Sequence, residues 1–325
     1  MKKLSLVTGA VCLAMAGTLH AQQNYPTKSI TIINGFAPGA TFDMVSRLVG
    51  NKLQERLGWR FLIDSRPGAD GRIGSRACAD AKNDGYTLCV GGSSTNAIHA
   101  AVFKSLPYDI QKDFVPIAFV GYSANVLAVN PTFPAKTVDE LIAAAKARGR
   151  LPYATAGTGT STHIAGEKFK DAAQVNMQHV AYKGGVPAYT ATISNEVSTV
   201  FGNASSIAPH IENGRLRALA VTSLNRLPTM PDVPSLNELG MSGFDVGPWY
   251  AFYAPAGLSP QIVQRLNKEI NAVLELPDVK ENLRKHHITT KLMTPEEVKK
   301  FGDQQIAAYK DIAQKSHIVL DANAK

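Results

Sequence analysis

The sequence predicts an α/β fold of two hinged domains, with largely parallel sheets and a ligand cleft between the domains. Short apolar strands alternate with amphipathic helices along most of the 325 residues, a pattern typical of α/β sheets. About 300 residues remain after an N-terminal leader, and chains of that length normally form two domains. Two apolar strands, 124–130 and 247–255, are predicted to cross between the domains and form a hinge.

These crossings divide the chain into a discontinuous first domain and a second domain inserted within it. We expect the first domain to contain residues 22–124 and 250–325, and the second to contain 125–249. Ligands of open α/β sheets bind at the carboxyl ends of the strands, so the cleft should lie between the two sheets. Expected helices cover 42–57, 73–81, 136–147 and 259–276, with a last helix from 294, and expected strands include 30–36, 60–64, 86–90, 153–156, 177–181, 197–201 and 216–222.

Several helix starts carry capping signals. Thr137 is followed three residues later by Glu140, which predicts a reciprocal capping box. Ser259 and Thr294 each precede a proline, and proline is favoured at the first helical position.

Residues 1–21 have the pattern of a secretory signal peptide. A positively charged start precedes the apolar run Leu4–Leu19, and Ala21 offers a small residue for cleavage before Gln22. The apolar run is too short to span a membrane, and Val11 before Cys12 does not fit a lipidation site. We therefore expect an exported protein.

The formal net charge is +8, two charges of which belong to Lys2 and Lys3 in the leader. Such a balance fits either a solvated basic surface or long-range attraction of anionic ligands. Nucleic acid is not an expected partner, because the chain is exported and contains no recognised binding motif. No other run is apolar enough to span a bilayer.

Two cysteines remain after the leader, Cys78 on an expected helix and Cys89 on the following strand. In an oxidising compartment they could form a disulfide worth roughly 2–4 kcal/mol. The alternative is a pair of buried free thiols, since sequence does not supply the geometry.

The residues expected to bind ligand lie where strands end in loops of Gly, Ser, Thr and Asn. Each such junction presents backbone N–H groups at a helix N-terminus, which favours an anion. The loop that follows strand 177–181 is equally compatible with a loop of the cleft and with a surface turn. The candidates are Phe36, Ala37, Pro38, Gly39, Ala40, Thr41, Ser93, Ser94, Thr95, Thr158, Thr160, Ser161, Thr162, His163, Tyr182, Lys183, Gly184, Asn203 and Ala204.

Other chemistries fit the sequence less well. The loop 157–162 begins like a dinucleotide fingerprint, but Thr162 stands where the third glycine belongs. An exported hydrolase using Ser161 or Ser94 would lack the G-x-S-x-G elbow, and the spacing of Ser161 and His163 does not favour a nucleophile–base pair. The histidines are scattered without metal-ligand spacing, so neither a metal nor a cofactor is expected.

Taken together, residues 25–303 resemble the Bug family, the TctC-type periplasmic receptors of tripartite tricarboxylate transporters. The resemblance is carried by the order and spacing of several short motifs. They are Arg66-Pro67-Gly68-Ala69, Asp84-Gly85-Tyr86-Thr87-Leu88, Leu106-Pro107-Tyr108-Asp109, Tyr182-Lys183-Gly184, the run 216–222, Pro231-Asp232-Val233-Pro234, Ala254-Pro255-Ala256-Gly257, and the pattern Gly157-x-Gly159-Thr160-x-x-His163-x-x-Gly166-Glu167.

The resemblance implies a periplasmic, monomeric receptor with a type 2 periplasmic binding protein fold. Such a receptor closes over a small organic carboxylate, either a di- or tricarboxylate or an aromatic acid, and delivers it to a tripartite tricarboxylate-type permease. An alternative role is that of a ligand-sensing adaptor for a membrane sensor.

Departures from the family pattern bear on the ligand. Ala40 replaces a glycine of the first loop. Gly202 replaces an aspartate, and we expect this change to leave more room in the cleft and to remove a negative charge from it. Arg72 stands in a turn that more often carries a small or amide residue, where it could grip a second carboxylate or remain solvated. Phe42 could stack on an aromatic acid or belong to the core.

Overall fold

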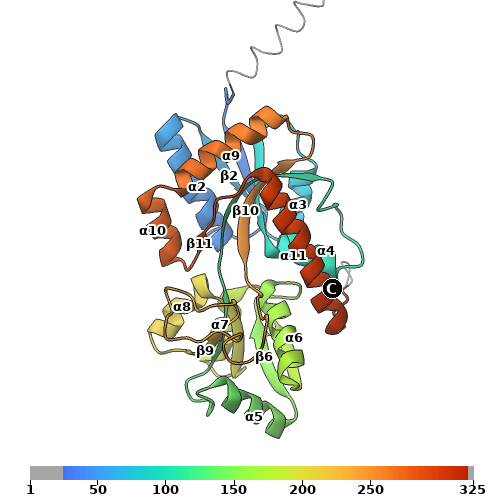
Figure 1. The fold of residues 1–325 in the computed structure, drawn as a ribbon, viewed down its shortest axis with the longest axis vertical. Coiled ribbons are helices and arrows are strands. Elements are labelled where there is room, and N and C mark those ends of the chain that lie inside the picture. Colours follow the sequence, from blue (N-terminus) through green and yellow to red (C-terminus); the bar gives the residue numbers. More distant parts are fainter. Residues whose placement is uncertain (1–24, 321–325) are drawn as a thin grey trace, which may run out of the picture.

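The computed structural model describes residues 25–320, so the predicted signal peptide and its cleavage point lie outside this range. Two domains, each built around one β-sheet, are stacked end to end (Figure 1). Among the described residues, no helix combines the length and the apolar character needed to cross a bilayer.

The first domain contains a six-stranded sheet in the order β11-β4-β10-β3-β1-β2. Its strands are β1 (Ile30–Asn34), β2 (Phe61–Ser65), β3 (Thr87–Gly92), β4 (Phe114–Tyr122), β10 (Trp249–Pro255) and β11 (Thr289–Thr290). Its helical segments are α2 (Thr41–Leu57), η1 (Ala69–Gly71), α3 (Arg72–Ala79), η2 (Ser94–Ile98), α4 (His99–Val102), α9 (Pro260–Leu274), α10 (Pro277–Lys285) and α11 (Pro295–Lys315).

The second domain contains a five-stranded sheet in the order β7-β6-β8-β5-β9. Its strands are β5 (Asn125–Val129), β6 (Leu151–Thr155), β7 (Met177–Ala181), β8 (Thr199–Asn203) and β9 (Arg217–Val221). Its helices are α5 (Val138–Arg148), α6 (Ser161–Ala173), α7 (Gly185–Ile193) and α8 (Ala204–Glu212). The C-terminal helix α11 belongs to the first domain but also contacts α6 of the second (Figure 1).

Local sequence explains where these helices begin. Thr294 and Glu297 form the full capping box of α11, and Ser259 accepts a hydrogen bond from the Ile262 N–H at the start of α9. At α5 the Thr137 hydroxyl accepts from the Glu140 N–H as expected. The Glu140 carboxylate, however, accepts from the N–H one residue before the cap rather than from the cap itself.

Both sheets are mixed, so the expectation of largely parallel sheets was wrong. Strands β1, β2 and β3 pair in parallel, as do β6, β7 and β8. Strand β10 is antiparallel to β3 and β4, and β5 is antiparallel to β8 and β9. Strands β5 and β10 each follow a crossing, where the chain enters a sheet from the other domain, and β11 at the sheet edge is also antiparallel to β4.

The two crossings lie side by side at the domain boundary. The Ser123 N–H donates to the Pro248 carbonyl at 2.8 Å. A Cβ at Gly247 would lie 2.2 Å from the Ser123 carbonyl oxygen, so only glycine permits this approach. One apolar core continues through the boundary, from Phe119 and Trp249 in the first domain to Phe201 in the second.

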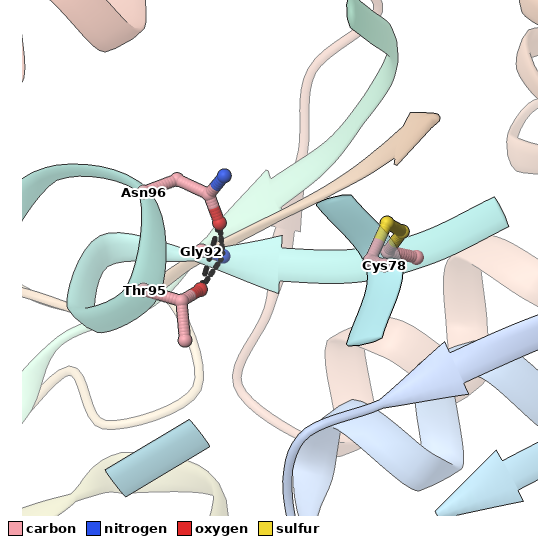
Figure 2. The surroundings of a disulfide bond; sticks show 5 residues. Cys78, Gly92, Thr95 and Asn96 are labelled. Atoms are coloured by element: carbon pink, nitrogen blue, oxygen red, sulfur yellow. Dashed lines mark hydrogen bonds between the residues drawn. A yellow bond between two sulfur atoms is a disulfide. The ribbon is translucent and has the colours of Figure 1, made fainter. Parts of the chain in front are cut away.

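Cys78 on α3 and Cys89 on β3 are joined by a disulfide, with their Cα atoms 6.2 Å apart (Figure 2). Both residues are buried, at 0% and 6% exposure. The bridge closes a short loop, for which the chain-entropy relation gives about 3 kcal/mol of stabilisation. It fixes α3 against the strand that leads to the domain boundary.

Candidate functional site

The N-termini of α2 and α8 meet across the domain boundary. The hydroxyl oxygens of Thr41 and Ser205 are 3.0 Å apart. Neither helix has a side-chain N-cap hydrogen bond: Ala40 has no side-chain acceptor, and Asn203, although it could cap, does not. A helix N-terminus carries a partial positive charge and unsatisfied N–H groups. The boundary therefore brings together two uncapped positive helix ends and two hydroxyls, an arrangement that suits an anion.

Buried polar atoms without hydrogen-bond partners lie around this meeting point. The Tyr250 hydroxyl adjoins those of Thr41 and Ser205 but completes no hydrogen bond of regular geometry. The Asn203 Oδ1 and Ser123 Oγ atoms are likewise buried and unpartnered within the described residues. Burial raises the pKa of Tyr250 well above its usual range, so this hydroxyl remains a neutral donor. Unpartnered buried polar groups are costly, and a polar ligand would satisfy them.

Two backbone N–H groups of the first loop, residues 36–41, donate to side chains close in sequence rather than being free for a ligand. Its Phe36 N–H donates to Asn34 Oδ1, and its Gly39 N–H donates to Asp43 Oδ2. Burial opposes ionisation of Asp43, but hydrogen bonds from Arg47 and from Gly39 outweigh it and hold the pKa of this carboxyl below its usual value. The middle of the loop, Ala37, Pro38 and Gly39, is exposed.

Phe42 belongs to an aromatic stack rather than standing alone at the helix start. It stacks on Phe36 with ring centroids 4.3 Å apart, and its edge contacts Tyr250 at 5.0 Å. The stack forms an apolar wall beside the hydroxyl cluster.

The expected loop at 91–96 is not a loop. Strand β3 continues to Gly92, and a π-helical turn, η2, begins at Ser94. The Thr95 Oγ1 and Asn96 Oδ1 atoms both accept from the Gly92 N–H, at 3.2 and 3.1 Å (Figure 2). Ser93, Ser94 and Thr95 are buried. The polar residues of this junction satisfy its own backbone, which the sequence pattern alone did not reveal.

The β6–α6 loop is also held internally, in part by a histidine. Thr160 caps α6 by accepting from the His163 N–H, and its hydroxyl donates to the Gly157 carbonyl at 2.7 Å. The Gly159 N–H donates to His163 Nδ1 at 3.3 Å. Thr162 Oγ1 accepts from the Ala156 N–H. Thr158 lies half-buried in the same turn.

His163 stacks on His179 of β7, with ring centroids 4.1 Å apart. Burial, with a smaller contribution from the positive charge of Lys170, lowers the pKa of His163 to about 4. Burial likewise lowers the pKa of His179 to about 3. Both imidazoles are therefore neutral at physiological pH.

The Tyr182–Gly184 loop lies next to the β6–α6 loop. The Tyr182 N–H donates to the Thr155 carbonyl and the Gly184 N–H donates to the Ala156 carbonyl. The Tyr182 hydroxyl donates to Glu196 at 3.1 Å, and Lys183 is exposed. Helix α7, which follows, has no side-chain cap.

Ser161 and His163 do not form a nucleophile–base pair. The Ser161 hydroxyl donates to Asn125 Oδ1 at 3.2 Å, while His163 Nδ1 accepts from Gly159. The described residues also contain no cluster of three or more side chains suited to hold a metal ion.

The sequence analysis missed residues that the fold brings to the boundary, notably Asp70, Phe103 and Tyr250. Asp70 has a positive φ of 54° and sits in η1 of the first domain. A Cβ at Gly157 of the second domain would lie 3.1 Å from its Oδ1. The glycines on either side of Ala69 and Asp70 signalled a turn, but nothing local indicated that the turn faces the other domain.

Gly202 does not open space in the cleft, contrary to expectation. A Cβ there would lie 2.6 Å from the Tyr189 ring and 2.8 Å from Ile207. The Tyr189 ring fills the space that a side chain at position 202 would occupy, so the change to glycine does not enlarge the cleft.

Residues 45–318 match the family described as the tripartite tricarboxylate transporter family receptor. The chain belongs to this family. Protein BugT of Bordetella pertussis is a full-length relative, 34% identical over 322 residues, which cover 97% of this chain and 98% of BugT.

Solved receptors share the fold. A protein of R. palustris solved with adipate superposes with a TM-score of 0.86 at 30% identity, over 91% of this chain and 99% of its own. MatC from Rhodopseudomonas palustris, solved with bound malate, gives a TM-score of 0.81 at 27% identity, over 89% and 99%. The family is one of receptors, and a structure described as the periplasmic binding protein BugD shares the fold with a TM-score of 0.82 at 28% identity, over 91% of this chain and 99% of its own.

Proposed function

We propose that this receptor binds a small organic carboxylate between its domains and delivers it to a tripartite tricarboxylate-type permease. The observation that carries the proposal is the convergence of Thr41, Ser205 and Tyr250 between the uncapped N-termini of α2 and α8. Adipate and malate in the related structures are both carboxylates, which supports the ligand class.

A carboxylate entering this point would replace the Thr41–Ser205 hydrogen bond. It would accept from both hydroxyls, from the Tyr250 hydroxyl and from first-turn N–H groups of both helices. Charge-assisted hydrogen bonds of this kind are roughly twice as strong as neutral ones. No group at the boundary is arranged for nucleophilic chemistry, so binding and release complete the cycle.

Binding and release require the domains to move apart. We propose a hinge at the two adjacent crossings, about which residues 22–124 and 250–325 move together as one body against residues 125–249. We also propose that the receptor works as a monomer. Because the ligand contacts both bodies, it favours the closed state by its differential affinity. Opening would break contacts that include the Thr41–Ser205 hydrogen bond and the approach of Asp70 to the loop at Gly157.

A thermal-shift screen of the purified protein against di-, tri- and aromatic carboxylates and acidic amino acids tests the proposal. A ligand that binds only the native state adds about 2.7 kcal/mol at a hundredfold excess over Kd, which corresponds to several degrees. The protein is first unfolded and refolded to remove retained ligand. We expect a shift confined to one class of carboxylate, and the absence of any shift would contradict the proposal.

A further inference from the structure

Arg72 lies at the domain boundary as the first residue of α3. Its guanidinium carbon is 4.2 Å from the centroid of the Phe103 ring. The same ring faces the second domain, since a Cβ at Gly159 would lie 3.3 Å from it. The stack therefore holds a permanent cation next to the β6–α6 loop.

This cation has an unused donor. The Nη1 atom of Arg72 is buried and has no hydrogen-bond partner among residues 25–320. A buried donor on a charged group is unfavourable while it has no hydrogen-bond partner. The position thus favours an incoming anion, and guanidinium geometry suits a carboxylate held by two parallel hydrogen bonds.

The nearest acid in sequence, Asp70, does not occupy this donor. Its carboxylate lies against Gly157 of the other domain. Burial raises the pKa of Asp70 and the charge of Arg72 opposes that rise, so the two groups interact through space without hydrogen bonding to Nη1.

A second unpartnered polar atom belongs to another residue that contacts the same aromatic ring. His99 is fully buried, its ring meets Phe103 edge-on at 5.3 Å, and its Nε2 has no partner among the described residues. Burial lowers the pKa of His99 to about 3, so its ring is a neutral hydrogen-bonding group. Phe103 therefore contacts both a cation and a neutral imidazole, each with an unsatisfied nitrogen.

The Phe36 ring links the turn before Arg72 to the start of α2. Phe36 stacks on Phe42 of α2, and a Cβ at Gly71, next to Arg72, would lie 3.0 Å from the Phe36 ring. A ligand that reaches both places would need two anionic ends and a hydrocarbon middle.

We propose that Arg72 is a specificity-determining residue that binds the second carboxylate of an aliphatic dicarboxylate. This inference rests on the proposed function, because the first carboxylate is the one held at the α2–α8 meeting point. A monocarboxylate would leave the guanidinium unpaired, whereas a dicarboxylate satisfies both ends of the site.

The test compares adipate with hexanoate, which have the same six-carbon chain and differ by one terminal carboxylate. Dissociation constants are measured by titration calorimetry for the refolded protein and for Arg72→Gln. We expect the protein to prefer adipate at least tenfold, and Arg72→Gln to lose at least tenfold in adipate affinity while hexanoate affinity changes less than twofold.

Two further variants separate the role of Arg72 from folding and from its neighbour. Arg72→Lys keeps the charge but loses the planar fork, so it should retain part of the preference for adipate. Asp70→Asn should retain the whole preference, because Asp70 does not use Nη1. Circular dichroism and the melting temperature of each variant report folding.

The outcomes discriminate between the two proposals. If Arg72→Gln lowers the affinities for adipate and hexanoate equally, or lowers neither, the role of Arg72 is overturned. The proposal of a carboxylate receptor then still stands. No binding of adipate, hexanoate, malate or any other acid of the screen by the parent protein overturns both.

Discussion

The β1–α2 and β3–η2 junctions lie on neighbouring parallel strands of one sheet and have similar small and polar residues, yet their backbone groups have different fates. After β1 the chain forms an exposed loop and enters α2 without a side-chain cap. After β3 it turns at once, and Thr95 and Asn96 bind the Gly92 N–H. The small and polar residues indicate where such a junction lies. The residue at which the strand ends determines whether the backbone N–H groups of the junction remain available for a ligand.

The β6–α6 junction is intermediate between these two. Its N–H groups are satisfied by its own side chains, but one acceptor, His163 Nδ1, is a group that can be protonated. The three junctions are therefore predicted to respond differently to substitution and to pH.

The largest expected effect is that of Gly92→Ala in the internally satisfied junction. A Cβ there would lie 2.0 Å from the backbone carbonyl oxygen of Trp249 and 3.1 Å from Phe42, so the sheet itself must shift. We expect the free energy of unfolding to fall by about 3 kcal/mol or more, measured by urea denaturation. Gly302→Ala on α11 is the matched control, because nothing lies near its added methyl group. That control should be neutral or stabilising by up to about 1 kcal/mol. A Gly92→Ala protein as stable as the control would refute this packing.

Acid should selectively destabilise the β6–α6 junction. The pKa of His163 is lowered by burial to about 4 in the folded protein, whereas an unfolded histidine titrates near 6.5. The unfolded state therefore binds more protons between these values, and stability present above pH 6.5 is lost as pH falls toward 4. Each unit in that window costs about 1.4 kcal/mol for this one group.

Urea denaturation at several pH values, with His163→Gln as the comparison, isolates this contribution. The parent protein should lose stability more steeply than the variant between pH 6.5 and 4.5, since Gln can accept the Gly159 N–H but does not titrate. Parallel pH profiles would show that His163 is not held neutral. His179 stacks on the His163 ring and Lys170 acts on it through space, while Tyr153 and Glu167 adjoin His179, and all four remain in both proteins.

The smallest expected effect on stability belongs to the uncapped junction. Thr41→Val removes one member of the Thr41–Ser205 hydrogen bond at a half-buried site, so the free energy of unfolding should change by less than about 1 kcal/mol. Carboxylate affinity should nevertheless fall about tenfold, because a charge-assisted hydrogen bond is lost. Calorimetry measures the affinity, and Thr41→Ser should restore it. Unchanged affinity in Thr41→Val would place the ligand elsewhere.

Sequence predicted the alternation of strands and helices and the capped starts of α5, α9 and α11, because these depend on residues within a few positions of one another. It did not predict the antiparallel placement of β5 and β10, which follows from how the chain re-enters each sheet. For the candidate site it named the first loop and the Asn203 junction, which the fold brings together at Thr41 and Ser205, and their role in binding stays a prediction. It missed Asp70, Phe103 and Tyr250, whose importance arises from contacts between residues far apart in the sequence.

The packing of Tyr189 against Gly202 has an evolutionary consequence. Any side chain at position 202 would collide with the tyrosine ring, and the tyrosine also hydrogen-bonds Ser206 at 2.8 Å on the first turns of α8. A lineage that acquires or loses an acid at 202 must therefore change position 189 in the same period or pass through a poorly folded intermediate. The identities of the two positions are thus linked by packing, and an acid fits at 202 only beside a smaller side chain at 189.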